Sequence, residues 1–135
     1  MPFVRITHAR DALSADQKAA LLQGAQDAVV AIEGEAMRIG VGVVIEEAIL
    51  DRALALNCLP FISVTLVRDA LTAAQRTEMA SRLVEAVVEV EGEARRGQIW
   101  VVIEESVASG EWSIGGNPLT LEALAAIKRG ENPWA

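Results

Sequence analysis

The sequence is short of the residues on which several kinds of protein chemistry depend. Its 135 residues include one cysteine, Cys58, and one histidine, His8, and no tyrosine. A single cysteine cannot form an intrachain disulfide, and one cysteine with one histidine does not make a zinc site. We therefore predict no metal and no other cofactor. Cys58 is predicted to be a small buried apolar residue, and His8 to be structural.

Positive charge and long apolar runs are also scarce. The formal net charge is -7, whereas phosphate binding needs a basic face, so we expect no nucleic-acid partner. No apolar stretch approaches the length of a membrane span, and the first ten residues lack the apolar core of a secretory signal. These absences predict a cytoplasmic protein with no membrane partner. Hydrophobic residues make up 52% of the chain, which suffices for the core of one domain.

An internal repeat is the strongest feature of the sequence. When the sequence is shifted by 58 residues, it aligns with itself without gaps. Chance does not produce such agreement, so the chain consists of two homologous halves. The clearest matching segments are 2–3 with 60–61, 10–13 with 68–71, 33–36 with 91–94, and 43–47 with 101–105.

Each half has the pattern of a strand, a helix and a second strand. Short β-rich runs open the halves, and capping-box sequences at 14–17 and 72–75 then mark the helix starts. A helical apolar pattern follows in both halves. Nearly continuous apolar runs at 41–45 and 99–103 are typical of central strands. Right-handed crossovers make the two strands of each unit parallel.

We therefore predict an α/β fold in which two tandem β-α-β repeats form one four-stranded sheet with both helices on one face. The other face has no helix to cover it, and its apolar strands predict burial in an oligomer. The chain is predicted to be one domain, 1–135. Its expected parts are a first β-α-β unit at 2–47, a linker at 48–59, a second unit with a glycine-rich hairpin at 60–117, and a C-terminal tail at 118–135 that contains a short helix and a loose end.

Pro2 carries the most distinctive chemistry. Removal of the initiator methionine would leave it with a free secondary amine. An α-amino group titrates at about 7.7–8.0, and an apolar pocket or a neighbouring cation lowers its pKa further, so this amine can act as a general base. Pro60 cannot do so, because Leu59 acylates its nitrogen. Proline is common as a second residue and usually has no function there, but here it opens a duplicated unit, which favours the catalytic interpretation.

These features resemble the tautomerase superfamily, typified by 4-oxalocrotonate tautomerase, whose short subunits are single β-α-β units that begin at a catalytic proline. Similar segments are 2–4 and 14–18, which match the family's opening strand and helix start, and 99–105 and 112–116, which match its second strand and closing hairpin. The resemblance implies a tautomerase fold with Pro2 as the catalytic residue. It also implies a homotrimer, because fused members of this kind form trimers that mimic a hexamer of short subunits.

The substrate-binding residues match the family less closely. Trp112 stands where the family has the aromatic wall of its pocket. The family arginine before the first helix is absent, but Arg10 and Arg68 lie three residues earlier, as a carboxylate-binding arginine does in the related haloacrylate dehalogenases. Arg68 could bind a substrate carboxylate bidentately or pair with a local acid, and local pairing is favoured for Arg10. Trp100 replaces a family arginine and could wall the pocket or pack in the core.

Three functions are compatible with this pattern. The favoured one is a tautomerase in which Pro2 moves a proton on a small unsaturated 2-hydroxy or 2-oxo carboxylate. The second is a dehalogenase-like hydratase or a decarboxylase of the same superfamily, with Pro2 as the acid and a carboxylate that activates water. The adjacent glutamates at 46–47 and 104–105 cannot act as pairs in such a role, because neighbouring strand residues face opposite sides of a sheet. The third is an oligomeric binding protein without the chemistry, which the missing family arginines suggest.

Overall fold

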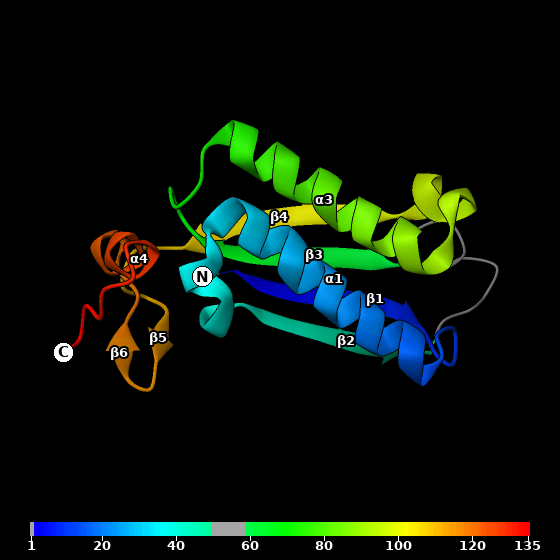
Figure 1. The fold of residues 1–135 in the computed structure, drawn as a ribbon, viewed down its shortest axis with the longest axis horizontal. Helices are drawn as coiled ribbons and strands as arrows, with labels where there is room; N and C mark the ends of the chain where they lie inside the picture. Colours follow the sequence, from blue (N-terminus) through cyan, green and yellow to red (C-terminus); the bar gives the residue numbers. More distant parts are fainter. Residues whose placement is uncertain (1, 50–58) are drawn as a thin grey trace.

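A four-stranded sheet with two long helices on one face forms the body of the molecule (Figure 1). The computed structural model describes residues 2–49 and 59–135. In chain order the elements are β1 (Phe3–Ala9), α1 (Ala15–Glu33), the 3-10 helix η1 (Glu35–Gly40), β2 (Gly42–Ala48), β3 (Phe61–Val67), α3 (Ala73–Glu91), the 3-10 helix η2 (Glu93–Gln98), β4 (Trp100–Val107), β5 (Ser113–Ile114), β6 (Asn117–Pro118) and α4 (Leu121–Lys128). The predicted fold of two β-α-β repeats is confirmed.

The sheet has the order β2-β1-β3-β4 and is built by two kinds of pairing. Within each repeat the strands are parallel, β1 with β2 and β3 with β4. Between the repeats, β1 and β3 pair antiparallel at the centre of the sheet, with Phe3 opposite Thr65 and Thr7 opposite Phe61. The beginning of each repeat therefore lies beside the end of the first strand of the other repeat.

Both long helices begin and end with local signals that the sequence encodes. Ser14 accepts a hydrogen bond from the backbone of Gln17, whose side chain in turn accepts one from the Ser14 backbone. The second helix repeats this capping box at 72–75. The first helix ends at Gly34, whose φ of 98° is a conformation that glycine adopts without strain. The predicted helix starts are thus confirmed in both repeats.

The core lies between the helices and the sheet, and a smaller apolar cluster lies under α4. Alternate residues of β1 and β3, such as Val4 and Ile62, point toward the helices and are fully buried. The smaller group, called here the α4 cluster, contains Met37, Val67, Leu119, Leu124 and Ile127. Trp112 and Ala70 pack against it. This cluster fixes α4 to one end of the sheet.

The C-terminal region contains the predicted hairpin, β5 with β6, and the predicted short helix, α4. In the expected loose end, the Trp134 indole donates a hydrogen bond to the Pro118 carbonyl at 3.3 Å. Cys58 and most of the predicted linker lie outside the described residues. Within the described ranges, no helix is long and apolar enough to cross a membrane.

The uncovered face of the sheet is only partly apolar, which corrects the expectation from the strand sequences. Trp100 and Val102 are 55% and 40% exposed there. Arg5 and Glu46 form an ion pair on the same face, with 3.0 Å between Nε and Oε1. The apolar runs in the sequence overstate the apolar character of this face, because alternate residues of each run point into the core instead.

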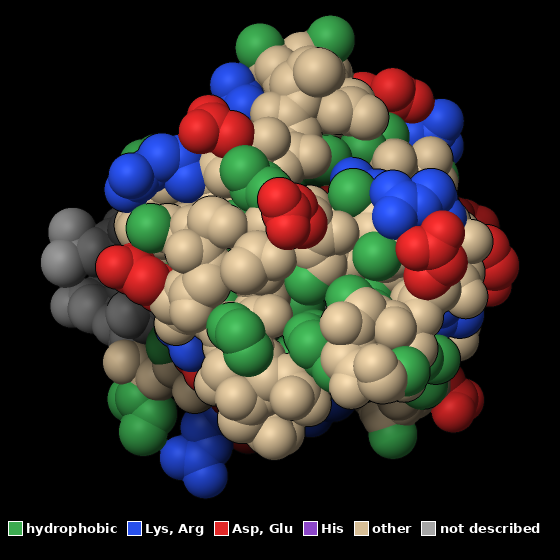
Figure 2. Space-filling model, turned by 90° about the vertical axis from the view of Figure 1, so that its left-hand side faces the viewer, with side chains coloured by type: hydrophobic (Ala, Val, Ile, Leu, Met, Phe, Trp, Pro, Cys, Tyr) green, Lys and Arg blue, Asp and Glu red, His purple; other side chains and the backbone are tan. Residues whose placement is uncertain are grey.

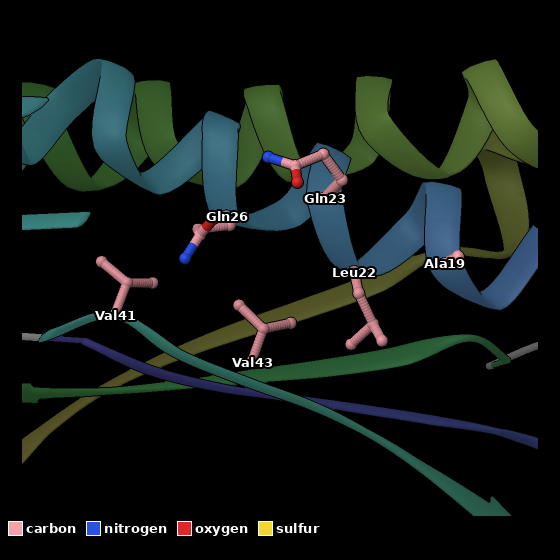
Figure 3. A pocket seen from close by; sticks show the side chains of 6 residues that line it. All are labelled: Ala19, Leu22, Gln23, Gln26, Val41 and Val43. Atoms are coloured by element: carbon pink, nitrogen blue, oxygen red, sulfur yellow. The ribbon is translucent and has the colours of Figure 1, made fainter. Parts of the chain in front are cut away.

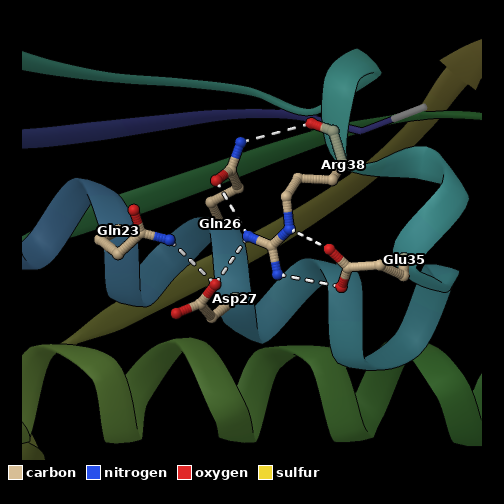
Figure 4. Close-up of polar contacts among 5 residues, drawn as sticks. All are labelled: Gln23, Gln26, Asp27, Glu35 and Arg38. Atoms are coloured by element: carbon tan, nitrogen blue, oxygen red, sulfur yellow. Dashed lines mark hydrogen bonds and ion pairs between the residues drawn. The ribbon is translucent and has the colours of Figure 1, made fainter.

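An arginine-centred network holds η1 against α1 (Figure 4). The Arg38 guanidinium donates to Glu35 at 2.6 Å and to Asp27 at 2.8 Å, and also to the Gln26 side chain. The Gln26 amide donates back to the Arg38 carbonyl at 3.3 Å. Met37 is the residue of η1 next to Arg38, so this network also fixes the position of Met37 in the α4 cluster.

We expect Arg38→Met to lower the melting temperature at neutral pH and to matter less in acid. Hydrogen bonds from Arg38 hold the pKa of Asp27 and of Glu35 below their ordinary values. The stabilisation from such carboxylates is present above about pH 4 and is lost as the pH falls through the lower folded-state pKa. Circular dichroism melts of both proteins should therefore converge below pH 4. A difference that stays constant into acid would contradict this role.

Candidate active site

Pro2 lies immediately before β1 and is buried. Its carbonyl accepts a hydrogen bond from the Gly42 backbone at 3.3 Å, which anchors it to the start of β2. Because Phe3 lies opposite Thr65 in the antiparallel β1–β3 ladder, Pro2 lies beside the end of β3. The candidate amine is therefore held at one end of the sheet by both of its neighbouring strands.

Arg68 follows β3 and so lies at the same end of the sheet as Pro2. Its backbone N–H donates to the Val107 carbonyl at 2.7 Å, which ties it to the end of β4. Its side chain is exposed, and Nε makes a long contact of 3.4 Å with the Glu105 carbonyl. Among the described residues, no carboxylate forms an ion pair with Arg68. Its guanidinium can therefore receive a carboxylate from a ligand.

Trp112 completes this group from the C-terminal side. It is half-buried and packs against the α4 cluster, whose Val67 immediately precedes Arg68. Figure 1 shows the mark of the N-terminus beside α4, β5 and β6, at the left of the view. The structure thus brings Pro2, Arg68 and Trp112 to one end of a single chain, which is called here the Pro2 end.

The other two predicted site residues, Arg10 and Trp100, lie at the opposite end of the sheet. Arg10 follows the end of β1. Trp100 begins β4 beside Pro60, to whose carbonyl its backbone N–H donates at 3.2 Å. Lys18, and more weakly Arg10, hold the pKa of the Glu47 carboxyl below its ordinary value. Trp100 is exposed, so core packing within the chain is the wrong interpretation for it. Neither residue meets Pro2 within one chain.

The paired glutamates divide between the two faces of the sheet, as their alternation requires. Glu46 pairs with Arg5 on the uncovered face, at 3.0 Å. Glu47 pairs with Lys18 of α1 on the helix side, at 2.7 Å. In the second repeat, Glu105 pairs with Arg76 of α3 on the helix side, at 3.1 Å. Neither adjacent pair can therefore act on one substrate.

Two charged residues of the Pro2 end, Glu33 and Lys128, are not predicted by the sequence pattern. Glu33 is the last residue of α1, and its side chain is only 1% exposed. Lys128, the last residue of α4, lies 3.1 Å from it, between Nζ and Oε2. The one sequence signal that could have found Glu33 is that both repeats carry glutamate at this position, as Glu91 in the second.

A separate open pocket of about 370 Å³ lies between α1 and the edge strand β2 (Figure 3). Its lining residues are Ala19, Leu22, Gln23, Gln26, Val41 and Val43. None of these side chains is ionisable or nucleophilic, so the pocket offers no acid, base or nucleophile. Elsewhere in 2–49 and 59–135, no group of three or more His, Cys, Asp or Glu residues could hold a metal ion.

The surface of the Pro2 end carries charges of both signs, as Figure 2 shows. Acidic and basic side chains are interspersed there, with hydrophobic side chains between them. Such a surface provides no broad positive field for an anionic ligand. An anionic ligand at this end would therefore need an individual cation such as Arg68.

Comparisons with known proteins agree with this geometry. A family model described as "Tautomerase enzyme" matches residues 60–122. A wild-type fused 4-OT, described as an asymmetric trimer, is similar over 90% of this chain and 98% of its own, with 24% identity and a TM-score of 0.74. Native fused 4-OT is similar over 91% of this chain and 98% of its own, with 21% identity and a TM-score of 0.75. A malonate semialdehyde decarboxylase inhibited by 3-bromopropiolate is similar over 91% of this chain and 95% of its own, with 15% identity and a TM-score of 0.65.

No curated protein matches the sequence significantly. The second repeat carries the tautomerase sequence pattern, and the whole chain has the fold of solved tautomerase-like proteins. Residues 60–122 thus carry the match to the tautomerase family, and the chain shares the fold of the fused 4-OT structures.

Proposed function

We propose that this protein is a tautomerase that isomerises a small unsaturated 2-hydroxy or 2-oxo carboxylate, with the Pro2 amine as general base. The observation that carries the proposal is the placement of Pro2, Arg68 and Trp112 at one end of the sheet. The match of residues 60–122 to the tautomerase family model supports the reaction class. The three side chains together supply what the reaction needs: a base, a cation for the carboxylate and an apolar wall.

In the proposed reaction, the free Pro2 amine takes the proton of the substrate's enol hydroxyl. The ammonium then returns that proton to a carbon of the conjugated system. An O–H bond breaks, a C–H bond forms, and the double bond shifts toward the oxygen, so no other reactant is consumed. Burial of Pro2 disfavours its charged form, which helps it act as a base near neutral pH.

Arg68 and Trp112 orient the substrate in this mechanism. The Arg68 guanidinium binds the carboxylate, which fixes the distance from the enol to the amine. The Trp112 ring covers the conjugated system and excludes water. Pro60 has no equivalent role, because its nitrogen is acylated by Leu59, whose carbonyl accepts a hydrogen bond from Arg95 at 2.8 Å. Each chain therefore has one amine site.

A hydratase or decarboxylase reaction is the second candidate. Its support is the buried carboxylate of Glu33 at the Pro2 end, together with the structural similarity to a malonate semialdehyde decarboxylase. In that reaction Pro2 would act as a protonated acid. The pH dependence of kcat/KM separates the two, because a base mechanism gains activity as Pro2 loses its proton and an acid mechanism loses it.

Covalent labelling tests the role of Pro2 directly. Treatment with 3-bromopropiolate and peptide mapping by mass spectrometry are expected to place the label on Pro2. Pro2→Ala should lower kcat/KM for phenylenolpyruvate or 2-hydroxymuconate by about 100-fold or more, because it alters the amine that moves the proton. Pro60→Ala is the matched control and should keep the activity. Label at another residue, or equal rates for wild type and Pro2→Ala, would exclude the proposed mechanism.

The two repeat-equivalent arginines should differ in their effect on activity. Arg68→Ala is expected to raise KM and to lower kcat/KM by about 10- to 100-fold, the scale of a lost charge-assisted hydrogen bond. Arg10→Ala removes the same side chain from the opposite end and should leave kcat/KM nearly unchanged. Equal losses in the two variants, or none in Arg68→Ala, would show that Arg68 does not bind the carboxylate.

We further propose that the active form is a homotrimer whose sheets face inward. Trp100 and Val102 leave apolar surface on the uncovered face, and closed symmetry would cover it in every subunit at once. The similar fused 4-OT structures are described as trimers, which supports this assembly. A neighbouring subunit could then bring its Trp100 to the Pro2 end, which a single chain does not do.

Sedimentation equilibrium at micromolar concentration tests the assembly. The expected mass is three times that of the 14.4 kDa chain. Val102→Asp places a charge on the uncovered face and should dissociate the trimer. Ser81→Asp adds the same charge on the exposed side of α3 and should leave the mass unchanged. A wild-type protein that sediments as a monomer would rule out the trimer.

A further inference from the structure

Most cations at the Pro2 end are neutralised by carboxylates of the chain itself. Arg68 is the exception, since no acidic side chain within 2–49 and 59–135 forms an ion pair with it. A ligand therefore meets one available cation at this end rather than several. The ion pairs that engage the others, all at 2.6–3.1 Å, are Arg38 with Glu35, Arg76 with Glu105, Lys128 with Glu33, and Arg129 with Glu131.

Arg76 is the cation that would otherwise stand beside Arg68. The backbone carbonyl of Glu105 accepts the 3.4 Å contact from Arg68 Nε, and Glu105 Oε1 lies 3.1 Å from Arg76 Nη1. One residue of β4 thus contacts both arginines, one through its carbonyl and the other through its carboxylate. The same Arg76 nitrogen also donates to the Leu71 carbonyl at 2.8 Å. Glu105 therefore neutralises the second arginine and leaves Arg68 to receive an anion alone.

The pair of Arg76 with Glu105 belongs to the fold rather than to the Pro2 end alone. Its equivalent in the first repeat, 58 residues earlier, is Lys18 with Glu47, at 2.7 Å. In both repeats a cation near the start of the helix holds a glutamate of the second strand. The consequence differs between the two ends, because only the Pro2 end can carry a free amine. The pair at the Pro60 end therefore provides a matched control.

The rest of the Pro2 end suits an apolar group better than a second anion. Trp112 is half-buried there, and Ile114 of β5 and Leu121 of α4 are exposed. Figure 2 shows hydrophobic side chains between the charges of this end. A carboxylate that loses water without gaining a cation is disfavoured, whereas an apolar group is stabilised by the same contact.

We propose that the ion pair of Arg76 with Glu105 restricts the substrate to monocarboxylates with an apolar far end, such as an arylenolpyruvate. This specificity rests on the proposed function, in which Arg68 binds the substrate carboxylate beside the Pro2 amine. Glu105 determines it in two ways: it engages Arg76, and its own charge repels a second carboxylate. The apolar remainder of the substrate then lies against Trp112.

Two unreactive ligands of equal length test this specificity without any turnover. Hexanoate and adipate have the same carbon chain, and adipate carries a second carboxylate where hexanoate ends in a methyl group. Each is titrated into the wild-type protein, and binding is followed by NMR through the Trp112 indole N–H. Hexanoate is expected to bind about 10-fold more tightly, because the second carboxylate of adipate finds no cation.

Glu105→Gln should remove this preference, because it releases the Arg76 guanidinium for a second carboxylate. Adipate is expected to gain about 10-fold in affinity, the scale of one charge-assisted hydrogen bond, while hexanoate changes little. Combining Glu105→Gln with Arg76→Gln removes the released cation and should abolish the gain. Glu47→Gln, the matched control at the Pro60 end, should leave both affinities unchanged. With substrates, Glu105→Gln should raise kcat/KM for 2-hydroxymuconate relative to phenylenolpyruvate.

Adipate that binds the wild type as tightly as hexanoate would overturn the inference, and so would the absence of binding by both ligands. The same holds for a preference that Glu105→Gln leaves unchanged, an equal gain in Glu47→Gln, or a gain that persists in the double variant. The wild-type comparison needs no substitution, so it decides even where Glu105→Gln does not fold. The proposed function fails separately: a protein that prefers hexanoate but isomerises neither substrate keeps the specificity and excludes the tautomerase reaction.

Discussion

The antiparallel ladder between β1 and β3 is the contact on which the rest of the structure depends. It joins two β-α-β units that could not each bury a full core, and it makes the sheet continuous. It also runs the two repeats in opposite directions, so the start of each repeat lies beside the end of the first strand of the other. The proximity of Pro2 to Arg68 follows from this pairing alone. A parallel arrangement of the two units would place them at opposite ends.

Duplication makes the two ends alike, and covalent chemistry then makes them different. Pro60 is acylated because the chain continues through Leu59, whereas Pro2 can become a free amine. The side chains at the two ends differ as well. The Pro60 end has a polar network of His8, Glu91 and Arg95, in which Glu91 Oε2 has no hydrogen-bond partner among the described residues. The Pro2 end replaces two of these three with apolar residues and adds α4. A chain of two fused repeats can specialise its ends in this way, whereas identical single-repeat subunits cannot.

Most of the fold could be predicted from the sequence because its signals are local and occur twice. Capping boxes, apolar runs and the 58-residue shift each define an element without reference to its neighbours. The site was less predictable, because it depends on which segments meet. Local pairing was already favoured for Arg10 but left open for Arg68, and the strand pairing shows that only Arg68 lies at the Pro2 end. Glu33 lies in a helix that reads as ordinary, and its partner Lys128 is about 95 residues away in the chain. The anchoring of Trp134 to Pro118 is equally non-local.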